Sequence, residues 1–152
     1  MNTQNPAALE AEHNELHVRL ERTIQMGGEV GDAAARVAEV LHAHFVGEER
    51  YGVPPLALLP ALAAGRVERE MAEVVTLTET LKAELPKMLA EHQAVAAALD
   101  DLAAAARRAN STEVIAFTEQ LKLHMQNEEE VLYPAAILVG EYLKLKLGVP
   151  AE

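Results

Sequence analysis

Apolar residues recur every three or four positions along this chain, which is the period of amphipathic α-helices. The first stripe consists of Leu9, Leu16, Leu20 and Ile24, and the second of Val37, Val40, Leu41 and Phe45. Asn5-Pro6 opens the first helix and Gly27-Gly28 ends it, because proline suits an early helical position and glycine stops a helix. We predict that a second helix runs from Gly31-Asp32 to about Arg50.

Prolines and glycines interrupt the helical pattern in the middle of the chain. The stretch 52–60 contains three prolines and a glycine, which predicts a loop with at most short turns. A third helical region begins near Arg66. It carries Pro86, which predicts either a kink or a split into two helices.

The last long helix is predicted to begin at Asn110-Ser111, which has the polar side chains of a helix cap. Glu113 is the expected capping-box partner. The helix runs to Tyr133-Pro134, where the proline predicts a bend, and further helix is expected over 135–147.

Two parts of the chain repeat each other, including their polar residues. The triplet Ala-Glu-His at 11–13 recurs at 90–92, and the segment 41–49 recurs as 121–129 with histidine and glutamate in the same places. A proline follows each copy. A helical hairpin repeated once is a four-helix bundle in outline. We therefore predict an all-α, up-down four-helix bundle of two repeated hairpins (about 9–56 and 88–136), forming a single domain over 1–152.

Composition narrows the chemistry that such a bundle can carry. The 152 residues are 50% hydrophobic, which suffices for a core, and they include no cysteine, so a metal must bind through nitrogen and oxygen atoms. The net charge of −11 argues against nucleic acid and anionic membranes as partners. No secretion signal or membrane-spanning window is visible, and we expect a cytoplasmic protein.

Histidines and glutamates lie on the apolar faces of all four predicted helices. Successive residues rotate by about 100°, which places His13 within the first stripe and His17 toward its edge. The corresponding residues of the other helices are His44 and Glu48, then His92, then His124 and Glu128. A lone buried histidine is more often a hydrogen-bonded core residue, and a lone glutamate is more often a boundary residue. Here both explanations would have to hold in both halves, and burying an unpaired carboxylate costs several kcal/mol, so we interpret the set as a metal site.

Other polar residues near these motifs are assigned to the surface. His42 faces nearly opposite to His44. Three acidic residues rotate away from the core and are interpreted as solvated: Glu49, Glu129 and Glu130. Glu12 and Glu91 are expected to face outward, with support of a metal-binding histidine as the alternative. Tyr133 either reaches the site or only packs beside Pro134.

The predicted ligands favour two metal ions over one. Five histidines and two glutamates exceed the roughly four to six ligands of a single ion, and they suit two ions that share the carboxylates. The imidazoles argue against calcium and magnesium, which prefer oxygen ligands. Iron, manganese and zinc all suit this donor set, and the sequence does not rank them.

The pattern resembles the hemerythrin-like (HHE cation-binding) domain, in which a lone histidine is followed by His-x-x-x-Glu and the unit occurs twice. The resemblance covers roughly residues 9–140. It implies a non-heme di-iron centre that binds oxygen. It further implies that one iron takes His13, His17 and His44, that the other takes His92 and His124, and that Glu48 and Glu128 bridge them.

The chain departs from the oxygen carriers of that family in two places. Their His-x-x-x-His pair lies on the third helix, whereas here it is His13 and His17 on the first helix, and position 96 is alanine. Their last carboxylate is an aspartate five residues after its histidine, whereas Glu128 follows His124 by four.

Three functions remain open at this point, and we favour the first. It is a di-iron protein that binds or senses oxygen, nitric oxide or peroxide, or that buffers iron. The second is a di-iron enzyme that disposes of peroxide or oxidises a small substrate at an open coordination position. The third is a zinc-stabilised or metal-free bundle that serves as an interaction module. A ferritin-like carboxylate site is disfavoured because leucine, at 89 and 121, takes the glutamate position of Glu-x-x-His in the second half. The sequence gives no indication of the oligomeric state.

Overall fold

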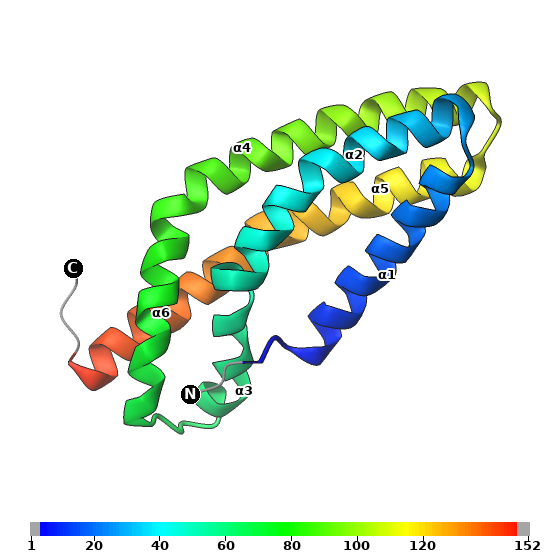
Figure 1. The fold of residues 1–152 in the computed structure, drawn as a ribbon. Helices are drawn as coiled ribbons and strands as arrows, with labels where there is room; N and C mark the ends of the chain where they lie inside the picture. Colours follow the sequence, from blue (N-terminus) through cyan, green and yellow to red (C-terminus); the bar gives the residue numbers. More distant parts are fainter. Residues whose placement is uncertain (1–3, 149–152) are drawn as a thin grey trace.

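The computed structural model describes residues 4–148 and is helical throughout, with no strand among those residues. The longer helices are α1 (Ala7–Gln25), α2 (Gly28–Gly47), α4 (Glu73–Arg108), α5 (Thr112–Asn127) and α6 (Tyr133–Leu147). Figure 1 shows α1, α2, α5 and the upper part of α4 side by side, with α6 continuing the direction of α5. This arrangement confirms the predicted all-α four-helix bundle.

The turn between α1 and α2 is tighter than the sequence predicted. Gly27 and Gly28 both have a positive φ (68° and 60°), which glycine adopts without strain, and α2 begins directly at Gly28. The predicted start at Gly31-Asp32 was three residues late. Gly31 instead lies within the first turn of α2, where a Cβ would meet the carbonyl oxygen of Ile24 at 2.6 Å. Glycine at this position lets the two helices approach closely.

The proline-rich segment after α2 forms short turns, as predicted. It comprises the 3₁₀ turn η2 (Pro54–Leu58), the short helix α3 (Leu59–Ala63) and the 3₁₀ turn η3 (Arg69–Ala72). The apolar side chains of η2 are mostly buried, so this segment packs on the bundle rather than leaving it. The third helical region, predicted from near Arg66, thus begins as η3 and continues as α4.

Pro86 lies inside α4 and bends the helix without splitting it. The proline ring cannot donate a hydrogen bond to the carbonyl four residues earlier, and it crowds that carbonyl, which is the usual cause of a helix kink. In Figure 1 α4 changes direction between its green lower part and its yellow-green upper part. Of the two predicted outcomes, the kink is therefore the correct one.

The N-cap of α5 is Ser111, one residue later than Asn110, which the predicted capping box with Glu113 required. Ser111 is the N-cap residue, and its hydroxyl accepts a hydrogen bond from the amide of Val114 at 3.4 Å. Asn110 instead has a left-handed φ of 55° and lies in the turn after α4. The third helical residue after the cap is Val114, so Glu113 does not take the capping-box position.

Two apolar layers enclose a polar one in the bundle. The larger layer joins α1, α2, α4 and α5 through residues such as Leu20, Val37, Leu99 and Phe117. The smaller layer contains Tyr51, Leu81, Met88 and Tyr133. On α4, His92 lies between a member of each layer, Met88 and Val95. Within residues 4–148, no helix is both long enough and apolar enough to cross a membrane.

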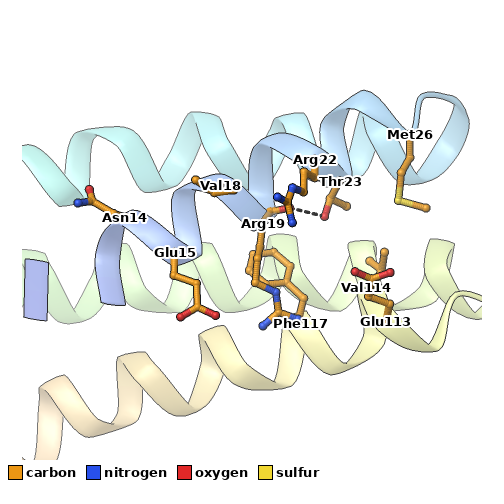
Figure 2. A pocket seen from close by; sticks show the side chains of 10 residues that line it. All are labelled: Asn14, Glu15, Val18, Arg19, Arg22, Thr23, Met26, Glu113, Val114 and Phe117. Atoms are coloured by element: carbon orange, nitrogen blue, oxygen red, sulfur yellow. Dashed lines mark hydrogen bonds between the residues drawn. The ribbon is translucent and has the colours of Figure 1, made fainter. Parts of the chain in front are cut away.

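A cleft of about 670 Å³ lies between α1 and α5 (Figure 2). Arg19 and Arg22 line it from α1, and Val114 and Phe117 line it from α5. The guanidinium group of Arg19 lies over the Phe117 ring, 5.2 Å from its centroid. No histidine lines this cleft, so the buried polar layer lies elsewhere in the bundle.

Candidate metal centre

Four histidines, one from each helix of the bundle, point into the polar layer. His13 comes from α1, His44 from α2, His92 from α4 and His124 from α5, and each is at most 5% exposed. Each lies on the apolar face of its helix, as the 100° rotation predicted. The bundle therefore encloses four imidazoles between its apolar layers.

The two glutamates, Glu48 and Glu128, are each the first residue of a π-helical turn. These turns are η1 (Glu48–Gly52) and η4 (Glu128–Leu132). In each, the amide five residues later bonds back to the carbonyl of the glutamate, and a proline follows directly. A proline ring clashes with the carbonyl four residues before it in an α-helix, and a wider turn accommodates the ring.

The sequence analysis did not identify these π turns. The signal for them was the proline that follows each glutamate by six residues, at the same place in both copies of the repeat. Single π turns inside α-helices occur frequently at functional sites. Here each turn places a carboxylate that is at most 1% exposed among the four imidazoles.

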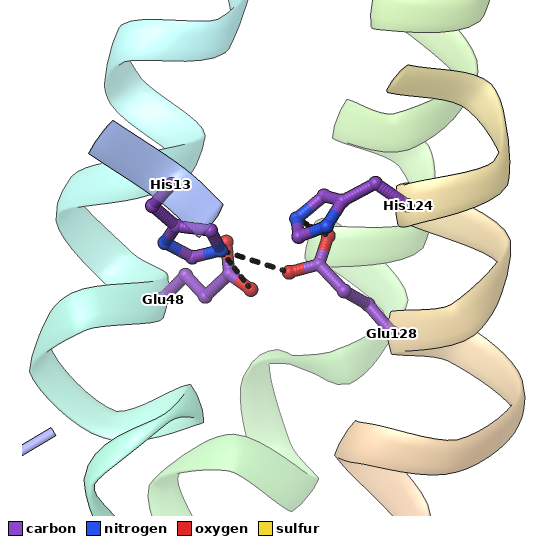
Figure 3. A group of neighbouring side chains, drawn as sticks. All are labelled: His13, Glu48, His124 and Glu128. Atoms are coloured by element: carbon purple, nitrogen blue, oxygen red, sulfur yellow. Dashed lines mark ion pairs between the residues drawn. The ribbon is translucent and has the colours of Figure 1, made fainter. Parts of the chain in front are cut away.

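The first group of potential ligands comprises His13, Glu48, His124 and Glu128 (Figure 3). One donor atom from each lies within 4.8 Å of the others. The Nε2 atom of His13 is 3.8 Å from Oε1 of Glu48 and 3.9 Å from Oε2 of Glu128. The Nε2 atom of His124 is 3.4 Å from Oε1 of Glu128.

The second group comprises His44, His92 and, once more, Glu128. The Nε2 atoms of His44 and His92 are 2.9 Å apart, and that of His92 is 3.4 Å from Oε1 of Glu128. Oε2 of Glu48 also lies 3.5 Å from Nε2 of His44. Both carboxylates therefore face both groups. We call these six residues the histidine–glutamate cluster.

The pairing of histidines differs from the one that the resemblance implied. His13 and His44 were expected to share one ion, and His92 and His124 the other. The structure instead groups His13 with His124 and His44 with His92, so each pair takes one histidine from each half of the repeat. The repeat alone could not reveal this grouping, because it depends on how the four helices pack around one axis.

His17 and His42 lie outside the cluster. His17 is exposed, and its ring packs on Phe45 with centroids 4.5 Å apart. It lies one turn beyond His13 on α1, about 6 Å further along the helix axis, which carries it past the polar layer. The structure thus does not bring the predicted ligand His17 to the other candidates. His42 is exposed, as its helical phase predicted.

Burial makes charge unfavourable on His13, His44, His92 and Glu48. It lowers the pKa of His44 to about 3 and that of His13 to about 4, and neighbouring histidines add to both shifts. It raises the pKa of Glu48 to about 8, with a contribution from Glu49. Several buried atoms of the cluster have no hydrogen-bond partner: His13 Nε2, His44 Nδ1, both Glu48 oxygens, His124 Nε2 and Glu128 Oε2.

The family model of the hemerythrin HHE cation binding domain matches residues 5–136. The chain belongs to this family. Comparison with curated proteins and with solved structures found no match.

The residues of this HHE domain fit a bound cation. Buried polar atoms without partners are rare in proteins, because each costs the free energy of its lost hydration. Here such atoms converge from α1, α2, α5 and the two π turns, and they are nitrogen and oxygen atoms of the kind that a transition metal binds. A cation removes that cost because it accepts lone pairs from neutral imidazoles and ionised carboxylates together.

Two carboxylates outside the cluster contact its histidines at Nδ1, the ring nitrogen that faces away from the cluster. Oε1 of Glu129 lies 2.8 Å from Nδ1 of His92, and Oε1 of Glu12 lies 2.5 Å from Nδ1 of His124. A carboxylate on Nδ1 fixes the ring orientation and leaves the lone pair of Nε2 free for a metal.

For Glu12, the structure supports the alternative interpretation, in which it assists a histidine. Glu129 is exposed, as predicted, but it also contacts His92, which the sequence analysis did not foresee. The rotation of 100° per residue that the sequence analysis assumed does not hold through the π turn η4.

Tyr133 also reaches the cluster. Its hydroxyl oxygen lies 3.3 Å from Nε2 of His44 and 3.4 Å from Nε2 of His92, and the side chain is 1% exposed. Burial raises the pKa of this phenol well above its ordinary value. The sequence analysis left open whether Tyr133 reaches the site, and the structure answers that it does.

Two small cavities approach the cluster from the surface. One of about 380 Å³ is lined by Glu12 and His124 together with residues of α5 and η4. The other, of about 130 Å³, is lined by His13 together with Glu10 and Glu49. Both abut histidines of the first group, so small ions or molecules have a short route to that side of the site.

Proposed function

We propose that this HHE domain holds two iron ions in the histidine–glutamate cluster and binds oxygen, nitric oxide or peroxide there. One observation carries the proposal: two groups of buried donor atoms share Glu128, and several of these atoms have no hydrogen-bond partner. Oε1 of Glu128 is 3.4 Å from both His92 and His124, and Glu48 directs Oε1 toward His13 and Oε2 toward His44, so both carboxylates are suited to bridge two ions. His13 and His124 would hold one ion, His44 and His92 the other, and the two glutamates would bridge them.

The donor chemistry is compatible with iron. Imidazole nitrogens argue against calcium and magnesium, and the chain has no cysteine to favour a thiolate-bound metal. Mixed imidazole and carboxylate ligands suit iron, and the family binds cations through its HHE motif.

The number of donor atoms supports the binding of an external ligand. The cluster offers four imidazole nitrogens and four carboxylate oxygens, whereas two ions with about six positions each take more than that. When bound, iron supplies the open positions and the redox chemistry on which oxygen, nitric oxide or peroxide binding depends. The protein keeps the site dry and orients His92 and His124 through Glu129 and Glu12.

Metal analysis of purified protein, with two matched variants, tests the proposal. We expect two irons per chain and an absorption spectrum that changes when oxygen, nitric oxide or peroxide is added to the ferrous protein. His13→Ala should lose most of the iron, whereas His17→Ala, one turn further along the same helix, should retain it. Zinc alone, no metal, or equal loss from both variants would contradict the proposal.

A di-iron enzyme that consumes peroxide is the second candidate. The observation that favours it is the exclusion of His17, which leaves one histidine fewer in the cluster than the resemblance to the oxygen carriers implied. Fewer protein ligands leave more positions at which a reactant binds. Peroxide consumption per iron distinguishes the candidates: sustained turnover favours the enzyme, and a stoichiometric, reversible spectral change favours the binding protein.

A further inference from the structure

The two groups of the cluster differ in their contact with a phenol oxygen. The hydroxyl of Tyr133 lies beside His44 and His92, the nitrogen donors of the second group. The first group has no such phenol. The repeat makes the comparison direct, because the residue five positions after Glu128 is Tyr133, whereas the residue five positions after Glu48 is Val53.

The position of the Tyr133 hydroxyl is that of a ligand. Donor atoms at adjacent positions around one octahedral ion, with bonds of about 2.1 Å, lie roughly 3 Å apart. The phenol oxygen is 3.3 and 3.4 Å from the two imidazole nitrogens, and Oε1 of Glu128 is at 3.4 Å from the nitrogen of His92. Tyr133 thus keeps the same spacing as the carboxylate that is expected to bind the ion.

The backbone holds Tyr133 in this place. Its amide donates to the carbonyl of Glu128 and closes the π turn, so the two side chains leave opposite ends of one rigid turn. Pro134 follows directly and fixes the start of α6. The side chain is fully enclosed by the smaller apolar layer, which leaves its hydroxyl only the cluster to face.

We propose that Tyr133 is a protein ligand of the ion held by His44 and His92, an inference that rests on the proposed two-iron function. On binding, the O–H bond breaks, the proton leaves to solvent, and an oxygen lone pair binds the ion with no change of its oxidation state. Ferric iron takes tyrosinate ligands in other proteins. The cation also supplies the charge that stabilises a buried phenolate.

This assignment makes the two ions unequal. The ion of His44 and His92 has one more protein ligand, whereas the ion of His13 and His124 keeps the additional free position. Both cavities that approach the cluster also abut the first group. The external ligand is therefore expected on the ion of His13 and His124 rather than on the ion beside Tyr133.

Resonance Raman spectroscopy of the air-oxidised, iron-loaded full chain tests this ligand. We expect a visible phenolate-to-iron charge-transfer band whose enhanced ring vibrations shift when the protein is made with ring-deuterated tyrosine. Tyr133→Phe should abolish the band. Tyr51→Phe is the matched control and should retain it, because Tyr51 lies in the equivalent turn η1 and in the same apolar layer, with its hydroxyl beside Gly47.

The outcomes separate the two proposals. Two irons without a phenolate band in the native chain would overturn the tyrosine ligand and leave the di-iron proposal standing. A chain without iron would overturn the di-iron proposal itself. A band that persists in Tyr133→Phe would overturn the assignment, as would its loss in Tyr51→Phe alone. If Tyr133→Phe fails to fold, the isotope experiment on the native chain still decides whether a tyrosine binds the iron.

Discussion

The metal-free protein should become less stable between pH 6.5 and 8 because of Glu48. Burial raises the pKa of this carboxyl from 4.5 to about 8 in the folded state. Between those values the folded state binds a proton that the unfolded state has lost, so the free energy of unfolding falls as the pH rises. His13, His44 and His92 contribute a smaller slope of opposite sign, because their lowered pKa values leave them neutral in the fold while the unfolded histidines lose their remaining charge between pH 6.5 and about 7.5.

The size of the effect follows from the same shift. One pH unit across such a window is worth about 1.4 kcal/mol, and the slope fades as the pH approaches the folded value. From pH 6.5 to 8 Glu48 therefore lowers the free energy of unfolding by about 2 kcal/mol, and the histidines offset about 1 kcal/mol of this loss. For a chain of this size the net loss of about 1 kcal/mol lowers the midpoint of thermal unfolding by roughly 2–4 °C.

Thermal unfolding followed by circular dichroism, in buffers with a chelator, measures this loss. Glu48→Gln cannot ionise and should abolish the fall in stability with rising pH, whereas Glu130→Gln, at an exposed position of η4, should leave it in place. The metal-loaded protein should also lack the slope, because a cation keeps Glu48 ionised at every pH in the window. An identical slope in the native chain and in Glu48→Gln would refute the argument.

Three further predictions concern other parts of the bundle. His44→Ala should lose bound metal while His42→Ala, two residues away on the same helix, keeps it, as measured by metal analysis; equal losses would show that the phase of α2 is misassigned. Glu129→Gln should weaken metal binding by roughly 10–100-fold in a competition titration, because an amide is a poorer partner for a histidine N–H. Gly140→Ala should lower the free energy of unfolding by about 1–3 kcal/mol in a denaturant titration, because its Cβ would overlap the side chain of the buried Thr78.

The sequence by itself determined the helices and the faces they bury. The 3.6-residue period fixes the face of a helix on which His44 or His124 lies. Prolines and glycines mark the turns, kinks and ends of helices. The repeat indicated two hairpins and singled out the glutamates of both. These signals are short-range, and for that reason they can be read without coordinates.

The tertiary structure decided which side chains meet. His124 is contacted by Glu12, 112 residues away, and His92 pairs with His44 across 48 residues. No period within one helix encodes such contacts, because they depend on how four helices are arranged around one axis. The same holds for the absence of His17 from the histidine–glutamate cluster. His17 lies toward the edge of the apolar stripe of α1, but it is one turn too far along the helix to reach the cluster. The π turns combine both kinds of information. The prolines that follow them are a local signal in the sequence, but only the packed bundle shows that the turns place carboxylates among histidines.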